Sequence, residues 1–365
     1  MKILFSGGGT LGSVTPLIAA SEEIHKLAPE AKFVWVGTRT GVERSFVAKQ
    51  GIPYRWICSG KLRRYFDLRN VLDIFSIAIG FVQSFFMLIF DRPSAVVVAG
   101  SFVQVPLVFA ARVLGIPVVL HQEDVEVGLA NRLSRSCATA ITLTFAESGA
   151  AFGARTVSVI GNPARHAIIA LTDPATHEKV RTAARARWGF SPEKPCLLVI
   201  GGGTGAAPLN DHISRIAPVL TEWCSILHLT GKGKGVKPPL LSKERVGVRY
   251  LQFELLTDAF PEAVAVADLA ITRAGLGTLT ELGCVGVPML IVPLPGHQQA
   301  NAKLLAARGA GIILDTAASD RVWTDTIRAL LHDRDRRSEL SRASAALFPA
   351  DASLKLARII LEVAE

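Results

Sequence analysis

The sequence has few cysteines, and no two of them form a close pair. Its 365 residues contain five, an odd number without a Cys-x-x-Cys motif: Cys58, Cys137, Cys196, Cys224 and Cys284. Such a scattered set argues against a disulfide framework and against a cysteine zinc site. The first residues, Met1–Phe5, also lack the charged start and long apolar core of a signal peptide. We therefore expect a protein of the reducing cytoplasm.

Acidic residues are also in short supply. The chain has 31 Asp and Glu against 40 Lys and Arg, a net charge of +9. This excess suits a polyanionic partner, which could be nucleic acid, an anionic membrane surface or a phosphorylated substrate. No basic stretch interleaved with aromatic residues and no nucleic-acid motif is present, so we expect no nucleic-acid partner.

Two common nucleotide-binding motifs are missing. The chain has no Gly-x-x-x-x-Gly-Lys-Ser/Thr loop, which excludes a P-loop ATPase. The glycines from Gly7 to Gly12 do not follow Gly-x-Gly-x-x-Gly in a convincing context, and no acidic residue clearly ends the second expected strand. An NAD-dependent dehydrogenase is therefore a weak alternative.

What is present is a repeated alternation of short apolar strands and helical stretches. This pattern predicts an α/β fold with parallel strands buried on both faces. The length exceeds the ~250 to 300 residues at which single cores stop growing, so we expect two domains. The expected strands are Ile3–Phe5, Phe33–Val36, Ala95–Ala99, Val118–Leu120, Ala140–Leu143 and Thr156–Ile160, then Pro195–Ile200, Ser225–Leu229, Arg249–Phe253, Val264–Ile271, Met289–Pro293 and Gly311–Leu314.

Both predicted domains open with a strand, a glycine turn and a helix. Gly7-Gly8-Gly9-Thr10 follows the first strand, and Gly201-Gly202-Gly203-Thr204 follows the strand after the polar helical stretch that ends near Lys194. We predict two doubly wound Rossmann-like domains, residues 1–164 and 165–350, facing each other across a cleft. A C-terminal helix over about residues 351–365 could return to the first domain.

The stretch Thr272–Glu281 reads Thr-Arg-Ala-Gly-Leu-Gly-Thr-Leu-Thr-Glu between an apolar strand and a helix. Gly275 and Gly277 would let a ligand approach the backbone at the helix N-terminus, where unpaired amides and the helix dipole favour an anion such as diphosphate. Glu281, one turn further on, could accept hydrogen bonds from ribose hydroxyls. The alternative is an ordinary tight turn between strand and helix.

Polar residues also follow two strands of the first domain. Gly100–Pro106 comes after one, and His121-Gln122-Glu123-Asp124 after another. The carboxyl ends of parallel strands are where open sheets bind ligands. An isolated histidine is usually structural, but three nearby acids, Glu123, Asp124 and Glu126, favour a site here.

The segment Ile74–Phe90 is strongly apolar and follows a basic cluster that contains Lys61, Arg63 and Arg64. It is at the lower limit of the ~17 to 25 residues needed to span a bilayer. A buried-strand pattern follows at once, so a spanning helix is disfavoured. The alternatives are a core helix and a helix that presents apolar surface to a membrane. The exposure of Phe81, Phe85, Phe86 and Phe90 decides between them.

A set of short motifs follows in order along nearly the whole chain: Gly8-Gly9-Thr10-x-Gly12, Gly100-Ser101-Phe102-Val103, Gly115-Ile116-Pro117 with His121, Gly128-Leu129-Ala130-Asn131, Gly161-Asn162-Pro163-x-Arg165, Gly201-Gly202-x-x-Gly205-Ala206, Gly231-Lys232-Gly233, Arg273-x-Gly275 to Glu281, and His297-Gln298-x-x-Asn301-Ala302. This ordered set resembles the MurG family, the N-acetylglucosaminyltransferases that complete lipid II in bacterial peptidoglycan synthesis. The resemblance implies the GT-B fold, an acceptor lipid linked to undecaprenyl diphosphate on the N-terminal domain, and UDP-GlcNAc mainly on the C-terminal one. It also implies a peripheral enzyme on the cytoplasmic face of the plasma membrane, which inverts the sugar's anomeric configuration without a cofactor or an obligatory metal.

Carried over to these positions, the resemblance implies two sets of binding residues. For UDP-GlcNAc it implies Arg165 and the Gly203–Thr204 turn at the uridine diphosphate, Glu281 on the ribose, and His297 with Gln298 on the sugar hydroxyls. The phosphates would lie near Arg273, Gly275, Leu276, Gly277 and Thr278. On the acceptor side it implies Thr10, Leu11, Gly12, Phe102, His121 and Asn131.

The sequence departs from the family at the position of the proposed base. The family usually reads Gly-Gly-Thr-Gly-Gly-His at the first turn, whereas this chain has Leu11 and ends the motif with Ser13. A serine hydroxyl without a neighbour that lowers its pKa cannot act as a base near neutral pH. The family's Glu-Gln-Asn after the histidine is here Gln122-Glu123-Asp124. We therefore predict that Asp124, or else Glu123, abstracts the proton. The alternatives are a transferase with a different lipid or glycoside acceptor, and a non-catalytic homologue that binds nucleotide sugars.

Overall fold

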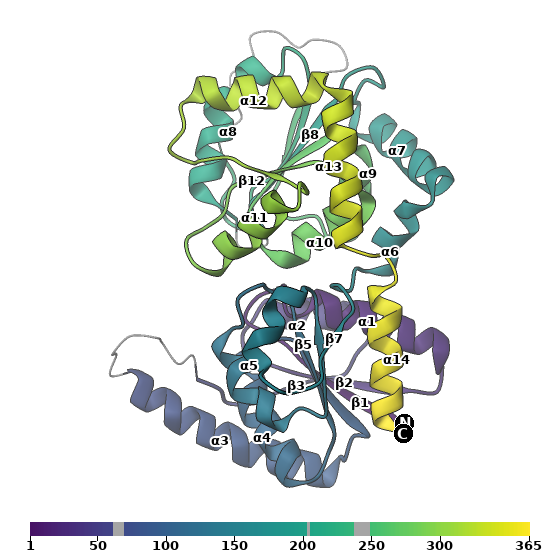
Figure 1. The fold of residues 1–365 in the computed structure, drawn as a ribbon, viewed down its shortest axis with the longest axis vertical. Helices are drawn as coiled ribbons and strands as arrows, with labels where there is room; N and C mark the ends of the chain where they lie inside the picture. Colours follow the sequence, from purple (N-terminus) through teal and green to yellow (C-terminus); the bar gives the residue numbers. More distant parts are fainter. Residues whose placement is uncertain (61–68, 203–204, 237–248) are drawn as a thin grey trace. The chain divides into compact units, whose positions relative to one another are not determined.

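The computed structural model describes residues 1–60, 69–202, 205–236 and 249–365, with the backbone alone for residues 69–72. The chain divides into two compact units (Figure 1): unit 1 is Met1–Arg165 with Asp351–Glu365, and unit 2 is His166–Ala350. Of the residues named above, Lys61, Arg63, Arg64, Gly203 and Thr204 lie outside the described part. That the two sheets face each other across a cleft stays a prediction.

Unit 1 contains a seven-stranded parallel sheet in the order β3-β2-β1-β4-β5-β6-β7. The order reverses between β1 and β4, which makes this pair the switch point where doubly wound sheets bind ligands. Every residue of β4 and β5 is buried, as their continuous apolar sequence predicts. The strands are β1 Lys2–Ser6, β2 Lys32–Gly37, β3 Tyr54–Trp56, β4 Ala95–Val98, β5 Val118–Gln122, β6 Ala140–Leu143 and β7 Ser158–Val159.

Helices cover both faces of this sheet, and successive residues of β1 point to opposite sides. Ile3 and Phe5 pack in a core with α1 and α14, whereas Leu4 belongs to a second core with α3 and α4. The C-terminal helix α14 thus returns to unit 1, where Leu356 and Ile360 are fully buried. The helices are α1 Thr15–Leu27, α2 Glu43–Lys49, α3 Arg69–Phe90, α4 Gln104–Val113, α5 Leu129–Ser134 and α14 Ala352–Ala364, with 3₁₀ turns η1 Arg135–Cys137 and η2 Ala146–Phe152.

Unit 2 repeats the plan with six parallel strands in the order β10-β9-β8-β11-β12-β13. Its switch point is the pair β8 and β11, so the predicted fold class of two doubly wound α/β domains is confirmed. The strands are β8 Cys196–Ile200, β9 Ser225–Leu229, β10 Tyr250–Phe253, β11 Leu269–Thr272, β12 Met289–Ile291 and β13 Ile312–Ile313. The helices are α6 His166–Ile169, η3 Ala170–Thr172, α7 Pro174–Trp188, α8 Ala207–Leu220, α9 Phe260–Val266, α10 Leu276–Val285, α11 His297–Ala307, α12 Asp320–His332 and α13 Arg334–Leu347.

The strand expected over Val264–Ile271 was wrong in its first half. Val264–Val266 end helix α9, and β11 begins only at Leu269. Val264, Ala265 and Val266 are all buried, and a continuous apolar run does not distinguish a buried helix end from a buried strand. The sequence interpretation also missed β3, a three-residue edge strand with two exposed residues.

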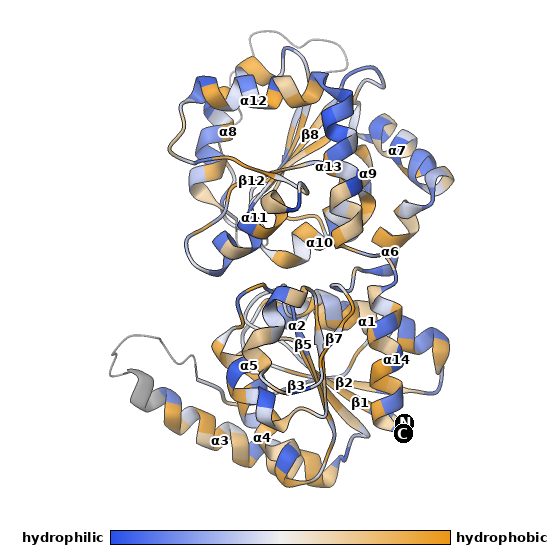
Figure 2. Ribbon diagram, in the orientation of Figure 1, coloured by the Kyte–Doolittle hydropathy of each residue, from blue (hydrophilic) through white to orange (hydrophobic). Residues whose placement is uncertain are grey.

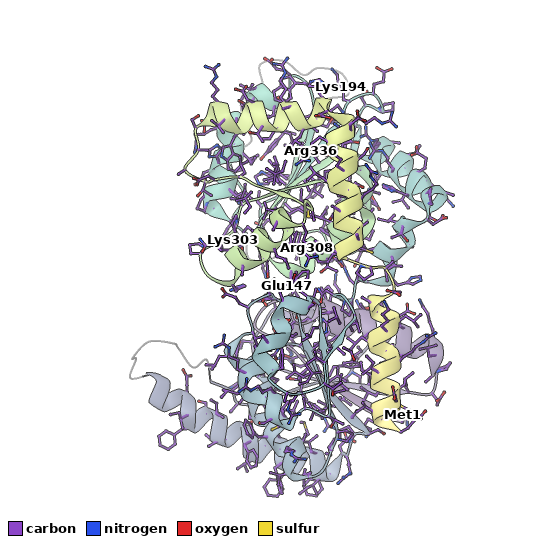
Figure 3. All side chains as sticks on the ribbon, in the orientation of Figure 1. Met1, Glu147, Lys194, Lys303, Arg308 and Arg336 are labelled. Atoms are coloured by element: carbon purple, nitrogen blue, oxygen red, sulfur yellow. The ribbon has the colours of Figure 1, made fainter. Side chains whose placement is uncertain are left out.

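Helix α3 has one buried side and one exposed side. Gly80, Ser84 and Leu88 are buried, whereas Phe90 is 84% exposed and Phe86 is 52% exposed. Phe81 and Phe85 are partly buried against the core that α4 shares. Figure 2 colours most of α3 as hydrophobic, with a few hydrophilic positions among them, and Figure 3 shows some of its side chains on the side away from the sheet of unit 1. The core-helix alternative therefore explains one face of α3 and leaves an apolar face uncovered.

Candidate functional site

Two glycine loops meet at the carboxyl ends of β8 and β11 in unit 2. Arg273, which follows β11, donates from Nη1 to the carbonyl oxygen of Gly205 at 2.9 Å, and Lys234 Nζ is 3.5 Å from the same oxygen. Gly205 has a φ of +67°, and a Cβ there would overlap the carbonyl oxygen of Thr230. This position therefore requires glycine, and the loop it forms is held beside two cations.

Helix α10 begins in this loop without a side-chain cap. Its N-cap is Gly275, with a φ of −75°, and a Cβ built there meets no heavy atom of the described residues within 4 Å. The first N–H groups of a helix have no intrahelical partner, and the dipole makes this end positive. The loop thus leaves open space beside Gly275 at a helix end whose first amides have no partner among the described residues, which is the geometry of an anion site.

Two amide side chains hold the loops around this helix end. Asn301 Nδ2, fully buried in α11, donates to the carbonyl oxygen of Ala274 at 3.1 Å. Gln298 Oε1 accepts from the backbone N–H of Leu294 at 3.2 Å. Asn301 belongs to one of the sequence motifs but received no role there. Its position one helical turn after Gln298 could have indicated that both side chains lie on the same face of α11.

The other predicted donor-site residues differ in exposure. The side chains of Leu276 and Glu281 are buried, Thr278 is half-buried, and His297 is exposed at the first position of α11. Leu276 can therefore offer a ligand its backbone amide but not its side chain. Arg165 is the last residue of unit 1 before the chain enters unit 2, and it is half-buried.

In unit 1, the loop after β1 is held from the strands on both sides. Trp35 Nε1, on β2, donates to the Gly7 carbonyl oxygen at 3.0 Å, and Ser101 Oγ, after β4, donates to the Gly8 carbonyl oxygen at 2.9 Å. Gly9 has a φ of +83°, and a Cβ there would lie 2.8 Å from the ring of Phe102. Phe102 therefore packs against the backbone of this loop.

The tip of the same loop contains four predicted site residues. Thr10 is exposed, Leu11 and Gly12 are half-buried, and Ser13 is buried. The Ser13 hydroxyl has no hydrogen-bond partner among the described residues, so no neighbouring base activates it. This geometry agrees with the argument that Ser13 does not replace the family's histidine as a base.

A chain of buried amides connects the loops of β4 and β5. Gln104 Oε1 accepts from Gly100 N at 2.8 Å, and its Nε2 donates to Asn131 Oδ1 at 2.8 Å. Asn131 Nδ2 donates to Gln122 Oε1 at 2.7 Å, and Gln122 Nε2 donates to the Asp124 carbonyl oxygen at 2.7 Å. Asn131 therefore positions the loops. Gln104 and Gln122 belong to the polar stretches that follow two strands in the sequence, but the sequence interpretation gave neither of them a role.

The two predicted base residues follow β5 directly. The Glu123 side chain is buried, and Asp124 is half-buried. Burial, and secondarily the negative charge of Asp124, raise the pKa of Glu123 well above its ordinary value. The pair therefore combines a carboxyl group that favours its protonated form with a neighbour that solvent and ligands can reach.

His121 lies within the sheet. Its Nδ1 is 2.9 Å from Thr142 Oγ1 on β6, and its Nε2 is 3.0 Å from Asn162 Oδ1. Burial lowers its pKa to about 4. With both ring nitrogens hydrogen-bonded inside the protein, His121 has the structural role expected of an isolated histidine and offers no free ring nitrogen to a ligand.

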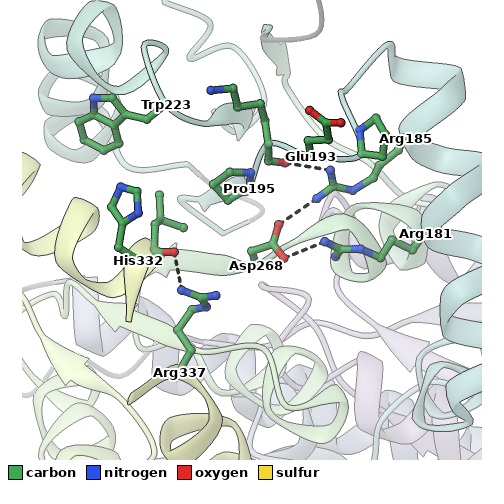
Figure 4. A pocket seen from close by; sticks show the side chains of 11 residues that line it. Arg181, Arg185, Glu193, Pro195, Trp223, Asp268, His332 and Arg337 are labelled. Carbon is green, nitrogen blue, oxygen red and sulfur yellow. Dashed lines mark hydrogen bonds and ion pairs between the residues drawn. The ribbon is translucent and has the colours of Figure 1, made fainter. Parts of the chain in front are cut away.

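A cavity of about 420 Å³ opens at the opposite edge of the sheet in unit 2, where β8 and β11 begin (Figure 4). Arg181 and Arg185 bind the two carboxylate oxygens of Asp268 at 2.7 and 2.9 Å. Arg337 donates to the carbonyl oxygens of Leu330 and Leu331 at the end of α12. These guanidinium groups hold α7 and α12 in place and are not directed at a ligand.

The chain matches known proteins along nearly its whole length. The glycosyltransferase family 28 N-terminal domain matches residues 3–143, and the C-terminal domain matches residues 196–356. The UDP-N-acetylglucosamine–N-acetylmuramyl-(pentapeptide) pyrophosphoryl-undecaprenol N-acetylglucosamine transferase of Shouchella clausii is 36% identical, covering 94% of this chain and 95% of the relative. The enzyme of that name from Legionella pneumophila is 34% identical and covers 100% and 97%. The crystal structure of Acinetobacter baumannii MurG has a TM-score of 0.74 at 25% identity, with 99% of each chain covered.

The buried histidines predict a pH dependence of stability. Burial lowers the pKa of both His121 and His228 to about 4, below the ordinary value of about 6.5. Between these pH values the two histidines bind protons in the unfolded chain but stay neutral in the folded one. The free energy of unfolding therefore falls as the pH falls from about 6.5 to 4. His121→Gln should reduce the stability lost between pH 7 and 5 by about 2 kcal/mol in urea unfolding.

The control for this experiment is His25→Gln, because His25 is exposed on α1. It should keep the pH dependence of the unaltered protein. If His121→Gln lost as much stability between pH 7 and 5 as the unaltered protein, His121 would not be buried in its neutral form.

Proposed function

Because this chain belongs to glycosyltransferase family 28, and within it to the MurG enzymes, we propose that it transfers N-acetylglucosamine from UDP-GlcNAc to the N-acetylmuramyl-pentapeptide on pyrophosphoryl-undecaprenol. The observation that carries the activity is the full-length likeness to enzymes of that name, at 36% and 34% identity. The product is the lipid-linked disaccharide of peptidoglycan synthesis. Through it the protein would serve cell-wall growth, cell shape and division.

In this proposal, the diphosphate of UDP-GlcNAc binds at the N-terminus of α10. The open space at Gly275 and the amides of Leu276, Gly277 and Thr278, which have no partner among the described residues, support this assignment. Arg273 would add positive charge beside them, and Arg165 with the Gly203–Thr204 turn is proposed to complete the uridine diphosphate site.

The ribose and sugar contacts are proposed from the same side of unit 2. Glu281, one turn into α10, would accept from the ribose hydroxyls, and the exposed His297 would reach the sugar. Gln298 Oε1 already accepts from Leu294 N, so its amide nitrogen is the group that would donate to a sugar hydroxyl.

The chemistry needs a proton acceptor and a stabilised leaving group. In an inverting transfer, the acceptor hydroxyl loses its proton as its oxygen bonds to the sugar's anomeric carbon, while the bond from that carbon to the diphosphate breaks. The helix dipole, backbone amides and arginines stabilise the diphosphate charge without a metal. We assign proton abstraction to Asp124, because it is the more accessible of the two carboxylates, and acceptor positioning to the loop Thr10–Gly12 with Phe102.

We further propose that unit 1 docks on the cytoplasmic face of the plasma membrane. Residues Asp73–Phe90 of α3 have the length and apolar composition of a membrane-crossing helix, but only 17% of this window is buried in the protein. An apolar stripe along one helix face fits a helix lying in the membrane interface, where the undecaprenyl acceptor is also held. The exposed apolar residues of this docking face are Ile74, Phe75, Ile79, Val82, Phe86, Ile89 and Phe90 on α3 and Phe109 and Val113 on α4.

Two measurements on the unaltered protein test the activity: titration of UDP-GlcNAc, and turnover with the lipid-linked muramyl-pentapeptide. The proposal expects binding and turnover. Turnover with other lipids or glycosides alone would favour a transferase with a different acceptor, an alternative motivated by Leu11 and Ser13 at the first turn. Binding without any turnover would indicate a non-catalytic homologue.

Gly275→Ala tests the donor site. The added methyl group meets no described atom, so the thermal unfolding temperature should not change, but it occupies the space in front of the α10 amides. We expect the Kd for UDP-GlcNAc to rise by about tenfold or more, the equivalent of losing about 1.4 kcal/mol. Gly128→Ala is the matched control, since Gly128 is also an open N-cap with a negative φ, at α5 of unit 1. Unchanged binding in Gly275→Ala would refute this site.

Asp124→Asn tests the base. It should lower kcat by about 10²- to 10⁴-fold and leave the Kd for UDP-GlcNAc unchanged, because general-base catalysis is lost while donor binding is not. Glu126→Gln, an exposed acid on the same loop, should keep full activity. If Asp124→Asn retained full turnover and Glu123→Gln lost it, the base would be Glu123.

Replacing Phe86 and Phe90 with serine tests membrane docking. Burying a phenylalanine side chain stabilises by about 1.5 to 3 kcal/mol, so each replacement should weaken partitioning to anionic vesicles by about tenfold or more. Leu255→Ser, at an exposed apolar residue of unit 2, is the control and should partition normally. Equal partitioning of all variants in a flotation assay would eliminate α3 as the docking face.

A further inference from the structure

Glu43 begins helix α2, but its carboxylate is fully buried and receives hydrogen bonds from three separate elements. Oε2 accepts from the backbone N–H of Gly9 at 3.1 Å, in the loop after β1. Oε1 accepts from the backbone N–H of Thr38 at 2.9 Å and from its hydroxyl, in the loop after β2. It also accepts from the Tyr54 hydroxyl on β3 at 3.3 Å. One side chain thus ties the loops at the carboxyl ends of β1 and β2 to Tyr54, the first residue of β3.

The surrounding backbone is shaped around this carboxylate. A Cβ on Gly8 would lie 2.6 Å from Glu43 Oε1, and a Cβ on Gly41 would overlap both oxygens. Tyr54 also donates to the Thr38 carbonyl oxygen at 2.6 Å, which fixes its hydroxyl next to Glu43. Burying a carboxylate is costly unless it is fully hydrogen-bonded, and these donors meet that condition.

The Gly9 contact is the functionally informative one. Gly9 immediately precedes Thr10, the exposed tip of the loop, and the ring of Phe102 packs on its other side. An uncharged polar side chain in this place could also stabilise the fold through a hydrogen bond. A carboxylate gives shorter and stronger hydrogen bonds to backbone N–H groups, so it fixes their direction more tightly.

We propose that Glu43 is a positioning residue for the acceptor substrate: by holding the Gly9 amide, it sets the conformation in which Thr10, Leu11 and Gly12 meet the lipid-linked acceptor. This inference rests on the proposed function. It assigns Glu43 an effect on acceptor use and none on UDP-GlcNAc binding, because the contacts of Glu43 all lie in unit 1.

Glu43→Gln tests the proposal, because the amide has the same shape but carries N–H donors on one side. With its oxygen directed to Thr38 and Tyr54, its nitrogen would face the Gly9 N–H, and that hydrogen bond would be lost. We expect kcat/KM for the lipid acceptor to fall by about 10- to 100-fold, with the KM for the acceptor raised. The Kd for UDP-GlcNAc should stay unchanged. Tyr54→Phe, which removes one donor and leaves the Gly9 contact, should retain near-normal kinetics.

Amide hydrogen exchange of the Gly9 peptide gives a second readout that does not need activity. Exchange at Gly9 should be faster in Glu43→Gln than in Tyr54→Phe. Unchanged exchange and kinetics, or equal losses of acceptor and donor binding, would overturn the proposal. If Glu43→Gln does not fold, Glu43→Asp serves in the same comparison, because its side chain is one methylene shorter and its carboxylate lies further from the Gly9 N–H. Absence of turnover in the unaltered chain would refute the proposed function, whereas unchanged Gly9 exchange would refute the role of Glu43.

Discussion

The arrangement of unit 2 depends on one helix end that is left uncapped. Strand β11 is buried along its length and ends at a turn that carries no side-chain cap for α10. The turn is instead held from outside, by Asn301 on Ala274 and by Arg273 on Gly205. Both contacts go to carbonyl oxygens, so they fix the turn without using the amides at the positive end of the α10 dipole. An anion site at the edge of a sheet needs both a fixed turn and helical amides that no other group of the protein uses.

Unit 1 reaches rigidity by a different route, because its loops are fixed by buried side chains. Gln104, Asn131 and Gln122 satisfy one another and the backbone of the loops after β4 and β5, and Glu43 binds the loop after β1. Fully satisfied buried networks rigidify the backbone they contact. The exposed Thr10 and the half-buried Asp124 therefore lie on backbone held by buried hydrogen bonds, which suits the substrate roles proposed for them.

Most strands of both sheets could be predicted, because parallel strands buried on both faces leave a continuous apolar signature; the largely exposed edge strand β3 was missed. That signature shows neither whether a buried segment is a strand or a helix end nor which face of a helix is covered. It merged the end of α9 with β11 across Val264–Ile271, and it did not show which face of α3 is covered. The turn at Gly275 was predictable from the apolar strand before it and the helical stretch after it, although its φ of −75° does not require glycine.

The partners of polar side chains could not be predicted in the same way. His121 was placed near a site by the acids that follow it, yet it lies inside the sheet between Thr142 and Asn162. Glu43 received no role, although its carboxylate joins the loops after β1 and β2 to Tyr54 on β3. In both cases the deciding contacts come from strands adjacent in space, and the distance along the chain conceals them.

The return of α14 to unit 1 has a consequence for biosynthesis. Unit 2 is one continuous segment, His166–Ala350, whereas unit 1 needs its last helix, whose Leu356, Ala357 and Ile360 sit in the same core as Phe5 and Trp35. As the chain leaves the ribosome, the first 165 residues would wait with part of their core open while unit 2 folds. The part made first would therefore be completed last.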